Sequence, residues 1–389
     1  MKYKTTVLLV TIICFSFIIS GCWSNIELSE RALIVAVGLD LSEDGQIEYT
    51  IQLVNPSLIG TQQSGGGKEN AVWVHTSKGE TVFDAIRNQF KVSNRRPFYS
   101  HIQVIVIGEK LAKEGIADAL DFFERNHETR LTTNILIAKE TTAQKILRAT
   151  SDLEQIPAVH LQGIINNHEK SGDIQASRMI DVIKLLSNEG IQPTISVIEI
   201  TSGAGSASMD MHNISIQGSG VFREDKLIGW LTPQETLGLL YINNLIKSGI
   251  ITVPNPLEKD KMVAIEAVRS YIKKDVKFID NKPKFFVKIN AIGSIAGQQG
   301  RSTPTTPAFL KELEKQCEED IKSIVSNTMM VSQNKYKSDI VGLGELVHIK
   351  YPEYWKEVKE VWPELYSRIP VDIEVVFTLQ RTGRISAPI

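Results

Sequence analysis

The sequence predicts a multidomain chain with an α/β N-terminal region built on a mixed sheet, followed by an α+β C-terminal region. The second region is expected to combine antiparallel strands with a long amphipathic helix. Three observations support this fold class. Strand-like runs alternate with helical stripes as far as residue 200, which is typical of an α/β layer. Two long strand-like runs follow, at 262–272 and 284–295. Apolar side chains then recur every three or four positions across 310–328, the spacing of one buried helix face.

The N-terminal region contains two kinds of predicted strand. Residues 32–40 are nearly all apolar, which indicates a strand that is buried on both faces. Residues 47–53 alternate between apolar and polar, which indicates a strand with one buried face. Further strands are predicted at 71–75, 101–108, 132–138 and 193–200, with helices at 79–90, 116–123, 143–148, 159–167 and 178–187.

A run of small and polar residues, SGAGSAS at 202–208, is the best domain boundary in the chain. Such residues contribute little to a core and favour an exposed connection. We therefore divide the chain into a signal segment (1–21), an N-terminal α/β domain (22–201), a linker (202–212) and a C-terminal α+β domain (213–389).

Two helix starts in the C-terminal region are defined by their capping residues. Thr232 and Glu235 form a capping box around Pro233, and Thr306 precedes Pro307 at the start of the long helix. A hairpin at 214–222 and 227–231 is expected before the first of these helices, and a closing strand at 371–380. Cys317 lies on the apolar stripe of the long helix, which favours a buried structural thiol over a reactive one.

The first residues have the pattern of a bacterial lipoprotein signal. A basic start with Lys2 and Lys4 precedes an apolar run at 7–19, and the run closes on ISGC at 19–22. The apolar run is too short for a comfortable transmembrane helix. An aliphatic residue, two small residues and Cys form a lipobox, so we expect acylation of Cys22. Several acyl chains on one residue give stable anchoring. The alternatives are a plain secretory signal and an uncleaved anchor helix.

Composition and motifs exclude several functions. The net charge of −2 provides no basic field for nucleic acid. With Cys14 in the signal and Cys22 acylated, Cys317 stands alone and no intramolecular disulfide is expected. The chain has no Gly-x-Ser-x-Gly elbow, no true phosphate loop and no zinc-binding helix. We therefore predict no cofactor, no metal site and no catalytic residue. Distant carboxylates that converge in the fold remain an open route to hydrolase chemistry.

The stretch 220–240 is the leading candidate for a surface that binds partner proteins. Trp230 stands at a predicted strand end, beside a capped helix that carries Leu237, Leu240 and Tyr241. An exposed Trp in an apolar patch is typical of an interface. Apolar residues at helical spacing are more often inside, so the alternative is that these side chains form the core of the C-terminal domain.

The chain contains a series of short motifs in a fixed order: GCW at 21–23 with Glu27, GLD at 38–40, GETVFDAIR at 79–87, RPFYSH at 96–101, GVFREDKLIGWL at 220–231, Glu235-Thr236, GLL at 238–240, DIVGLG at 339–344, YPEYW at 351–355 and RTG at 381–383. By these motifs the chain resembles, over essentially its whole length, the C-subunit lipoproteins of bacterial spore germinant receptors, the Ger(x)C family. One departure from the family pattern is Ser24, where an acidic residue is expected.

The resemblance implies a non-enzymatic receptor subunit that is required for germination and assembles with two integral-membrane subunits. It implies a lipid-anchored position on the outer face of the cytoplasmic membrane, the inner membrane of the spore, where nutrients trigger germination. A solute-binding lipoprotein is the alternative, which should show two similar α/β lobes and a hinged cleft. A cell-wall hydrolase is the third class, and it needs convergent carboxylates or a metal in a cleft.

We expect Cys22→Ala to leave the precursor unprocessed or mislocalised, because no other nucleophile stands at the cleavage site. Metabolic labelling with a fatty acid measures this directly. Continued incorporation of label by the variant would contradict the assignment of the anchor.

Overall fold

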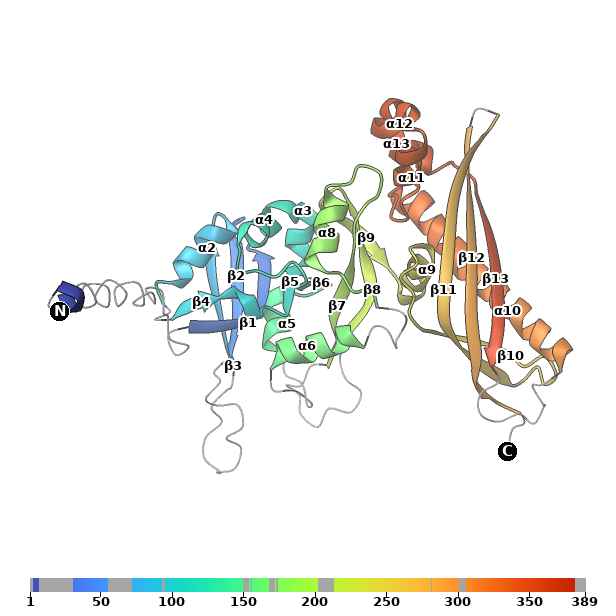
Figure 1. The fold of residues 1–389 in the computed structure, drawn as a ribbon, viewed down its shortest axis with the longest axis horizontal. Helices are drawn as coiled ribbons and strands as arrows, with labels where there is room; N and C mark the ends of the chain where they lie inside the picture. Colours follow the sequence, from blue (N-terminus) through green and yellow to red (C-terminus); the bar gives the residue numbers. More distant parts are fainter. Residues whose placement is uncertain are drawn as a thin grey trace.

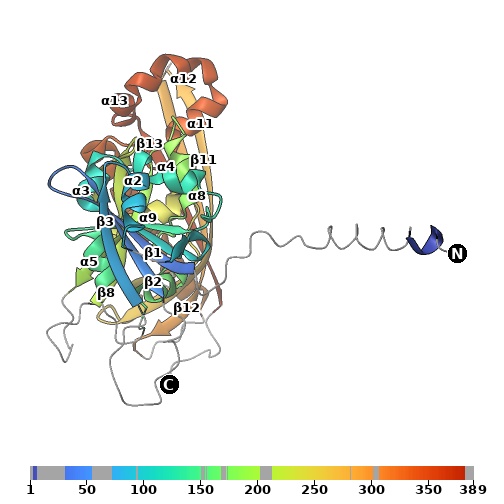
Figure 2. The same cartoon turned by 90° about the vertical axis from the view of Figure 1, so that its left-hand side faces the viewer.

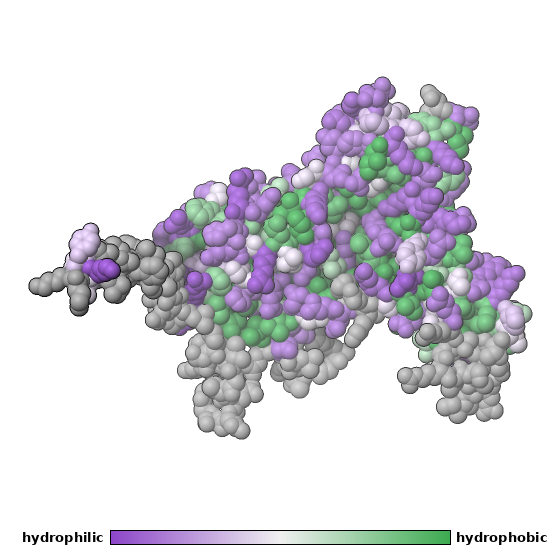
Figure 3. All heavy atoms as spheres, in the orientation of Figure 1, coloured by the Kyte–Doolittle hydropathy of each residue, from purple (hydrophilic) through white to green (hydrophobic). Residues whose placement is uncertain are grey.

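The computed structural model shows two β-sheets, each with its own helices, that lie one beyond the other along the long axis of the molecule (Figure 1). Its face in Figure 3 is largely hydrophilic, with hydrophobic patches on both halves. The structure describes residues 3–6, 31–54, 72–92, 95–149, 154, 156–167, 172, 174–201, 213–280, 282–300 and 306–381. The predicted lipidation residue Cys22 and the predicted linker, 202–212, lie outside the described residues.

The first sheet is mixed, as predicted. Its strands run in the order β3-β2-β1-β5-β6-β7-β8-β9, and β4 pairs with β1. The pairs β1·β5, β5·β6 and β6·β7 are parallel, whereas β1·β2, β2·β3, β7·β8 and β8·β9 are antiparallel. The strands are β1 (Arg31–Leu41), β2 (Ile47–Val54), β3 (Val72–Gly79), β4 (Arg96–Phe98), β5 (Val104–Gly108), β6 (Asn134–Ala138), β7 (Thr194–Thr201), β8 (Asn213–Arg223) and β9 (Lys226–Leu231).

Helices cover both faces of this sheet and form two cores with it. One core includes buried residues of α2, α3, α4 and α8, and the other includes buried residues of α5 and α6. The strands β5 and β6, apolar except for Asn134, are buried along their whole length between these layers. The elements are α2 (Val82–Gln89), η3 (Tyr99–His101), α3 (Glu109–Glu114), α4 (Ala117–Arg125), α5 (Ala143–Arg148), α6 (Pro157–Asn166) and α8 (Met179–Leu186).

Asp40 fixes one helix to the end of the first strand. Its carboxylate oxygens accept hydrogen bonds from the backbone N–H groups of Ala143 (2.8 Å) and Gln144 (2.9 Å), in the first turn of α5. A Cβ on Gly108 would lie 2.0 Å from Asp40 Oδ1, so the neighbouring strand leaves room for this carboxylate. Burial raises the pKa of Asp40, while the two backbone hydrogen bonds lower it.

The second sheet has the order β10-β11-β12-β13. The first three strands pair antiparallel, as predicted, but β13 runs parallel to β12. A parallel partner needs a long crossover, and the helices between β12 and β13 supply it. These strands are β10 (Gly249–Pro254), β11 (Met262–Ile279), β12 (Lys282–Gln298) and β13 (Val371–Arg381).

The long helix α10 lies against the second sheet, with α9 beside it. Thr232 and Glu235 form the predicted capping box at the start of α9, and Thr306 caps α10. Cys317 is fully buried on the α10 stripe, as predicted, and burial raises its pKa to about 12. The helices are α9 (Pro233–Ile242), α10 (Pro307–Met330), the π-helix η4 (Val331–Tyr336), α11 (Leu343–Lys350), α12 (Pro352–Val358), η5 (Lys359–Val361) and α13 (Trp362–Tyr366).

Figure 2 shows α11, α12 and α13 gathered at one end of the long strands β11 and β12. Phe278, near that end of β11, makes edge-on ring contacts with Tyr351 (4.8 Å) and Tyr354 (4.9 Å).

Among the described residues, no helix is both long and apolar enough to cross a membrane.

Sheet pairing continues across the predicted domain boundary. Strands β8 and β9 follow residues 202–212 in the chain, yet they hydrogen-bond into the first sheet through β7. The expected assignment of residues 213–231 to the C-terminal domain therefore differs from the observed sheet membership, which changes only after Leu231. Strand β8 satisfies its backbone N–H and C=O groups by pairing with β7. This pairing does not depend on the composition of residues 202–212, which connect the two strands.

We still expect protease cleavage within residues 202–208, because small polar residues rarely protect backbone. Since β7 and β8 pair antiparallel, the two fragments should remain together in native gel filtration and separate only in denaturant. Separation of the fragments under native conditions would contradict this pairing.

Candidate functional site

The two halves of the molecule meet where residues 336–345 lie against β8, β9 and the 188–192 segment. We call this region the junction. The side chain of Tyr336, the last residue of η4, reaches the C-terminal end of β9. Its hydroxyl accepts a hydrogen bond from the Trp230 N–H (3.0 Å) and donates one to the Trp230 carbonyl (2.7 Å). A Cβ on Gly229 would lie 2.2 Å from the Tyr336 ring, so this approach requires glycine.

Two further hydrogen bonds fix the same segment to β8. Arg223 donates from Nη2 to the Tyr336 carbonyl (2.7 Å). The Ser338 hydroxyl donates to the Phe222 carbonyl (2.7 Å), and it does so in a buried position. A shift of this segment would leave buried polar groups without hydrogen-bond partners, which is costly. These contacts therefore hold the end of η4 at one place on the hairpin.

Asp339 is buried at the centre of the junction. One carboxylate oxygen accepts the backbone N–H groups of Val341 (3.3 Å), Gly342 (2.9 Å) and Leu343 (3.1 Å). The other accepts the Gly344 N–H (2.6 Å) and the Trp362 indole N–H (3.0 Å). Burial raises the pKa of Asp339, and the hydrogen bonds that it accepts act in the opposite direction. All five contacts are donors, which suits a carboxylate that only accepts.

The backbone of the same segment joins the N-terminal half. The Gln192 N–H donates to the Asp339 carbonyl (2.8 Å), and the Glu345 N–H donates to the Gly190 carbonyl (2.9 Å). Asn188 donates from its side chain to Glu345 Oε1 (2.8 Å). A Cβ on Gly190 would lie 2.3 Å from the Glu345 nitrogen, so the two backbones pass in direct contact.

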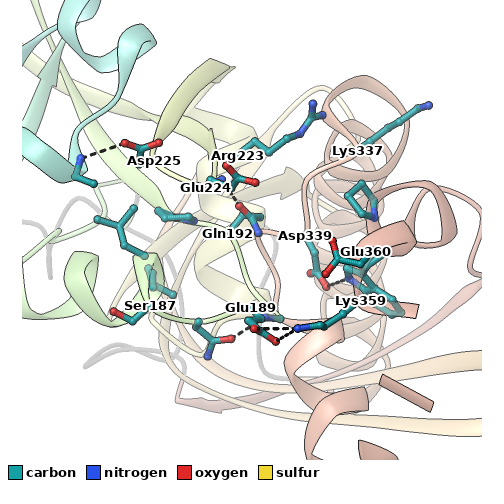
Figure 4. A pocket seen from close by; sticks show the side chains of 18 residues that line it. Ser187, Glu189, Gln192, Arg223, Glu224, Asp225, Lys337, Asp339, Lys359 and Glu360 are labelled. Atoms are coloured by element: carbon teal, nitrogen blue, oxygen red, sulfur yellow. Dashed lines mark hydrogen bonds and ion pairs between the residues drawn. The ribbon is translucent and has the colours of Figure 1, made fainter. Parts of the chain in front are cut away.

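Beside these contacts lies a cleft of about 500 Å³ that both halves line. Figure 4 shows its charged side chains, and Glu189 from one half points toward Lys359 from the other. Their ion pair spans 3.3 Å, and Lys337 forms a second pair, with Glu364, at 3.1 Å. Exposed pairs of this kind contribute little stability. These pairs and the further charged residues Arg223, Glu224, Asp225 and Glu360 make the cleft a charged seam between the halves.

A second cavity of about 380 Å³ lies on the junction near Lys274. Lys274 on β11 donates to Asn243 Oδ1 (2.9 Å) and to the Val341 carbonyl. Burial lowers the pKa of Lys274 to about 8, and the charges of Asp339 and Glu345 raise it. The cation thus supports the Asp339 segment from the side of the second sheet. Among the described residues, no group of three or more His, Cys, Asp or Glu side chains is arranged to hold a metal ion.

The predicted partner surface divides into an inner and an outer part. Leu240 and Tyr241 are buried, at 3% and 1% exposure, in the core beneath α10, so they do not belong to a surface in this structure. Leu237 is half-buried against the same core. Trp230 is half-buried against the other core, the one shared by α2, α3, α4 and α8. The expectation is corrected for Leu240 and Tyr241, because α10 covers their face of α9.

Sequence reasoning missed the residues that organise the junction. Neither Tyr336 nor Asp339 was singled out for a role, although Asp339 opens the DIVGLG stretch. The sequence did contain an indication: Asp339 is followed by Gly342 and Gly344. An Asp side chain in such a segment commonly accepts hydrogen bonds from the backbone N–H groups that follow it.

The fold and the junction define a class of protein with two unlike halves, a nine-stranded mixed sheet and a four-stranded sheet, joined through a buried carboxylate. The crystal structure of the GerBC protein has the same fold. It aligns with a TM-score of 0.58 at 22% identity and covers 88% of this chain and 96% of that chain.

Two family models match in chain order, "Spore germination protein N-terminal domain" over residues 24–200 and "Spore germination B3/ GerAC like, C-terminal" over residues 217–383. Spore germination protein KC of Bacillus subtilis (strain 168) is 27% identical over 387 residues, which cover 96% of this chain and 94% of the relative. Spore germination protein B3 of the same organism is 24% identical over 368 residues, or 94% and 95%. The chain belongs to the Ger(x)C family of spore germination proteins.

Replacement of Asp339 by Ala should lower the free energy of unfolding by about 3–5 kcal/mol, because five buried donors lose their acceptor. Urea unfolding monitored by Trp fluorescence measures this change. Asp372→Ala is the matched control, since Asp372 is exposed and only pairs with Lys284. It should change stability by no more than about 0.5 kcal/mol. Equal effects of the two variants would contradict the role of Asp339.

Proposed function

We propose that this chain is the lipid-anchored, non-enzymatic subunit of a nutrient germinant receptor at the inner membrane of the spore, and that germination requires it. The match of both family models, in order and over nearly the whole chain, carries this proposal. The lipobox that ends at Cys22 supports anchoring on the outer face of the cytoplasmic membrane. Two integral-membrane subunits are the proposed partners, and Trp230 and Leu237 are the proposed contact residues.

The shape of the molecule supports an assembly function over the two alternatives. A solute-binding lipoprotein is expected to have two similar lobes around a hinge, whereas the two sheets here differ in size and topology. A hydrolase requires carboxylates that converge on a substrate. In the cleft, Glu189 pairs with Lys359, and Asp339 is occupied by five donors from its own half.

Deletion of the gene tests the proposed function. We expect spores without this chain to lose the response to at least one nutrient mixture, measured as the fall in optical density of a spore suspension. Expression of the wild-type chain should restore the response, and Cys22→Ala should not. An unchanged response to every nutrient tested would contradict the proposal.

A pair of substitutions tests the proposed contact surface. We expect Leu240→Ala to lower stability by about 2–5 kcal/mol, because its side chain is removed from a core. Trp230→Ala should cost less, since its ring is half-buried, but should reduce co-purification with the membrane subunits. Thermal unfolding and affinity purification of the same preparations give the two values. Full co-purification of the Trp230 variant would place the docking surface elsewhere.

A further inference from the structure

Three apolar side chains stand exposed on α2 and directly after it. Phe83 is 51% exposed, Phe90 43% and Val92 61%, although the opposite face of the helix packs normally through Val82 and Ile86. Exposed apolar side chains that gather within ten residues mark an interaction site more often than scattered ones do. We call this surface, with the cations described next, the α2 face.

Two cations of the same segment, Arg87 and Lys91, accompany the exposed side chains, and further cations lie on β1 and β4. The Arg87 guanidinium lies 4.9 Å from the centre of the Phe83 ring, and Lys91 follows Phe90 directly. On the adjoining strands, Arg31 lies 4.4 Å above the Phe98 ring and pairs in register with Arg96. The carboxylates at the start of the helix already have contacts. Glu80 accepts from the Gln46 amide (2.9 Å), and Asp84 accepts from the Glu80 N–H (3.1 Å).

The α2 face is held firmly to the protein. The Phe83 ring lies 6.0 Å from that of Phe122, and Phe122 contacts Tyr99 edge-on at 5.6 Å. Tyr99 is buried at 6% exposure and belongs to the core of the first sheet. Exposure of Phe83 is therefore built into the packing and is not the result of a side chain that lacks support.

The position of the face in the molecule identifies its occupant. In Figure 1, α2, β4 and the start of β1 lie at the same end of the molecule, away from the second sheet. Arg31 is the ninth residue after Cys22. Nine residues span at most about 30 Å, so an anchor at Cys22 keeps this end close to the bilayer. Apolar side chains accompanied by Arg and Lys suit the boundary between anionic headgroups and acyl chains.

We propose that the α2 face rests on the anionic surface of the bilayer, with Phe83, Phe90 and Val92 at the level of the headgroups and Arg31, Arg87 and Lys91 on lipid phosphates. The inference rests on the proposed anchoring at Cys22. It adds an orientation: the first sheet stands at the membrane, and the second sheet projects away from it.

A thiol probe in the full acylated chain tests the contact. Val92→Cys is labelled with a bimane fluorophore, and the protein is placed in vesicles of equal parts phosphatidylcholine and phosphatidylglycerol with brominated acyl chains. Cys317 is buried and its pKa is raised, so the new thiol is labelled selectively. Ile349→Cys is the matched control, because Ile349 is 72% exposed on α11 in the other half.

We expect quenching at position 92, none at 349, and loss of the quenching in 0.5 M salt. Arg87→Gln combined with Lys91→Gln should weaken contact of the α2 face with the bilayer. The ratio of molecules with the face on the bilayer to molecules with the face in water should fall by roughly 25-fold, about fivefold for each cation. No quenching at 92, or equal quenching at both positions, would overturn the proposal. Protection of position 92 only when the membrane subunits are present would assign the face to a protein instead.

Failure of the anchor and failure of the face have different signatures. Absence of fatty-acid label contradicts acylation of Cys22. In that case Cys14 and Cys22 carry free thiols, so both are replaced by Ser before position 92 is labelled, and quenching is measured only on protein that cosediments with the vesicles. Acylated protein on the vesicles without quenching at 92 contradicts the face alone.

Discussion

The buried carboxylate of Asp339 links the conformation of one segment to the attachment of two domains. Its side chain gathers four consecutive backbone donors, Val341 to Gly344, and the Trp362 indole. Its carbonyl meanwhile accepts from Gln192 in the other half. Gly342 has a φ of +75°, which the turn around the carboxylate requires and which a side chain would disfavour. The Asp339 side chain closes the turn and the Asp339 carbonyl bridges the halves. A change that distorts the turn therefore also disturbs the attachment of the two halves.

Close approach adds specificity to a junction at which Val221 and Leu231 of the first sheet also join the core of the second half. The Tyr336 ring occupies the position of an absent Cβ at Gly229, and the Glu345 backbone does so at Gly190. The Tyr336 hydroxyl accepts a hydrogen bond from the Trp230 N–H and donates one to the Trp230 carbonyl, which fixes the same contact. A relative rotation of the halves would break all of these contacts together. The molecule is therefore suited to hold a fixed angle between its two sheets, and a hinged cleft would need a looser joint.

Local rules predicted most elements, and the errors arise where distant parts decide. The capping box at Thr232, the cap at Thr306 and the buried Cys317 follow from short spacings, so the sequence revealed them. Strand β10 and helix α3 were not predicted, although each is as long as the predicted helix α5. Leu240 and Tyr241 lie under α10, which begins more than sixty residues later in the chain, so no local pattern distinguishes their face from a free one. The membership of β8 and β9 in the first sheet depends on non-local pairing in the same way.

The junction also bears on the partner contact that we propose at Trp230, whose side chain is half-buried. Tyr336 holds the backbone of Trp230 on one side, and a Cβ on Gly220 would lie 3.4 Å from its ring on the other. The indole is therefore ordered before any partner arrives, and association does not need to restrict its rotamers again. Since Trp230 contacts Tyr336 where the sheets meet, a protein bound at both Trp230 and Leu237 would touch both halves only at the angle that Asp339 and Tyr336 maintain. Recognition by a membrane subunit would then depend on the intact junction as much as on the exposed side chains.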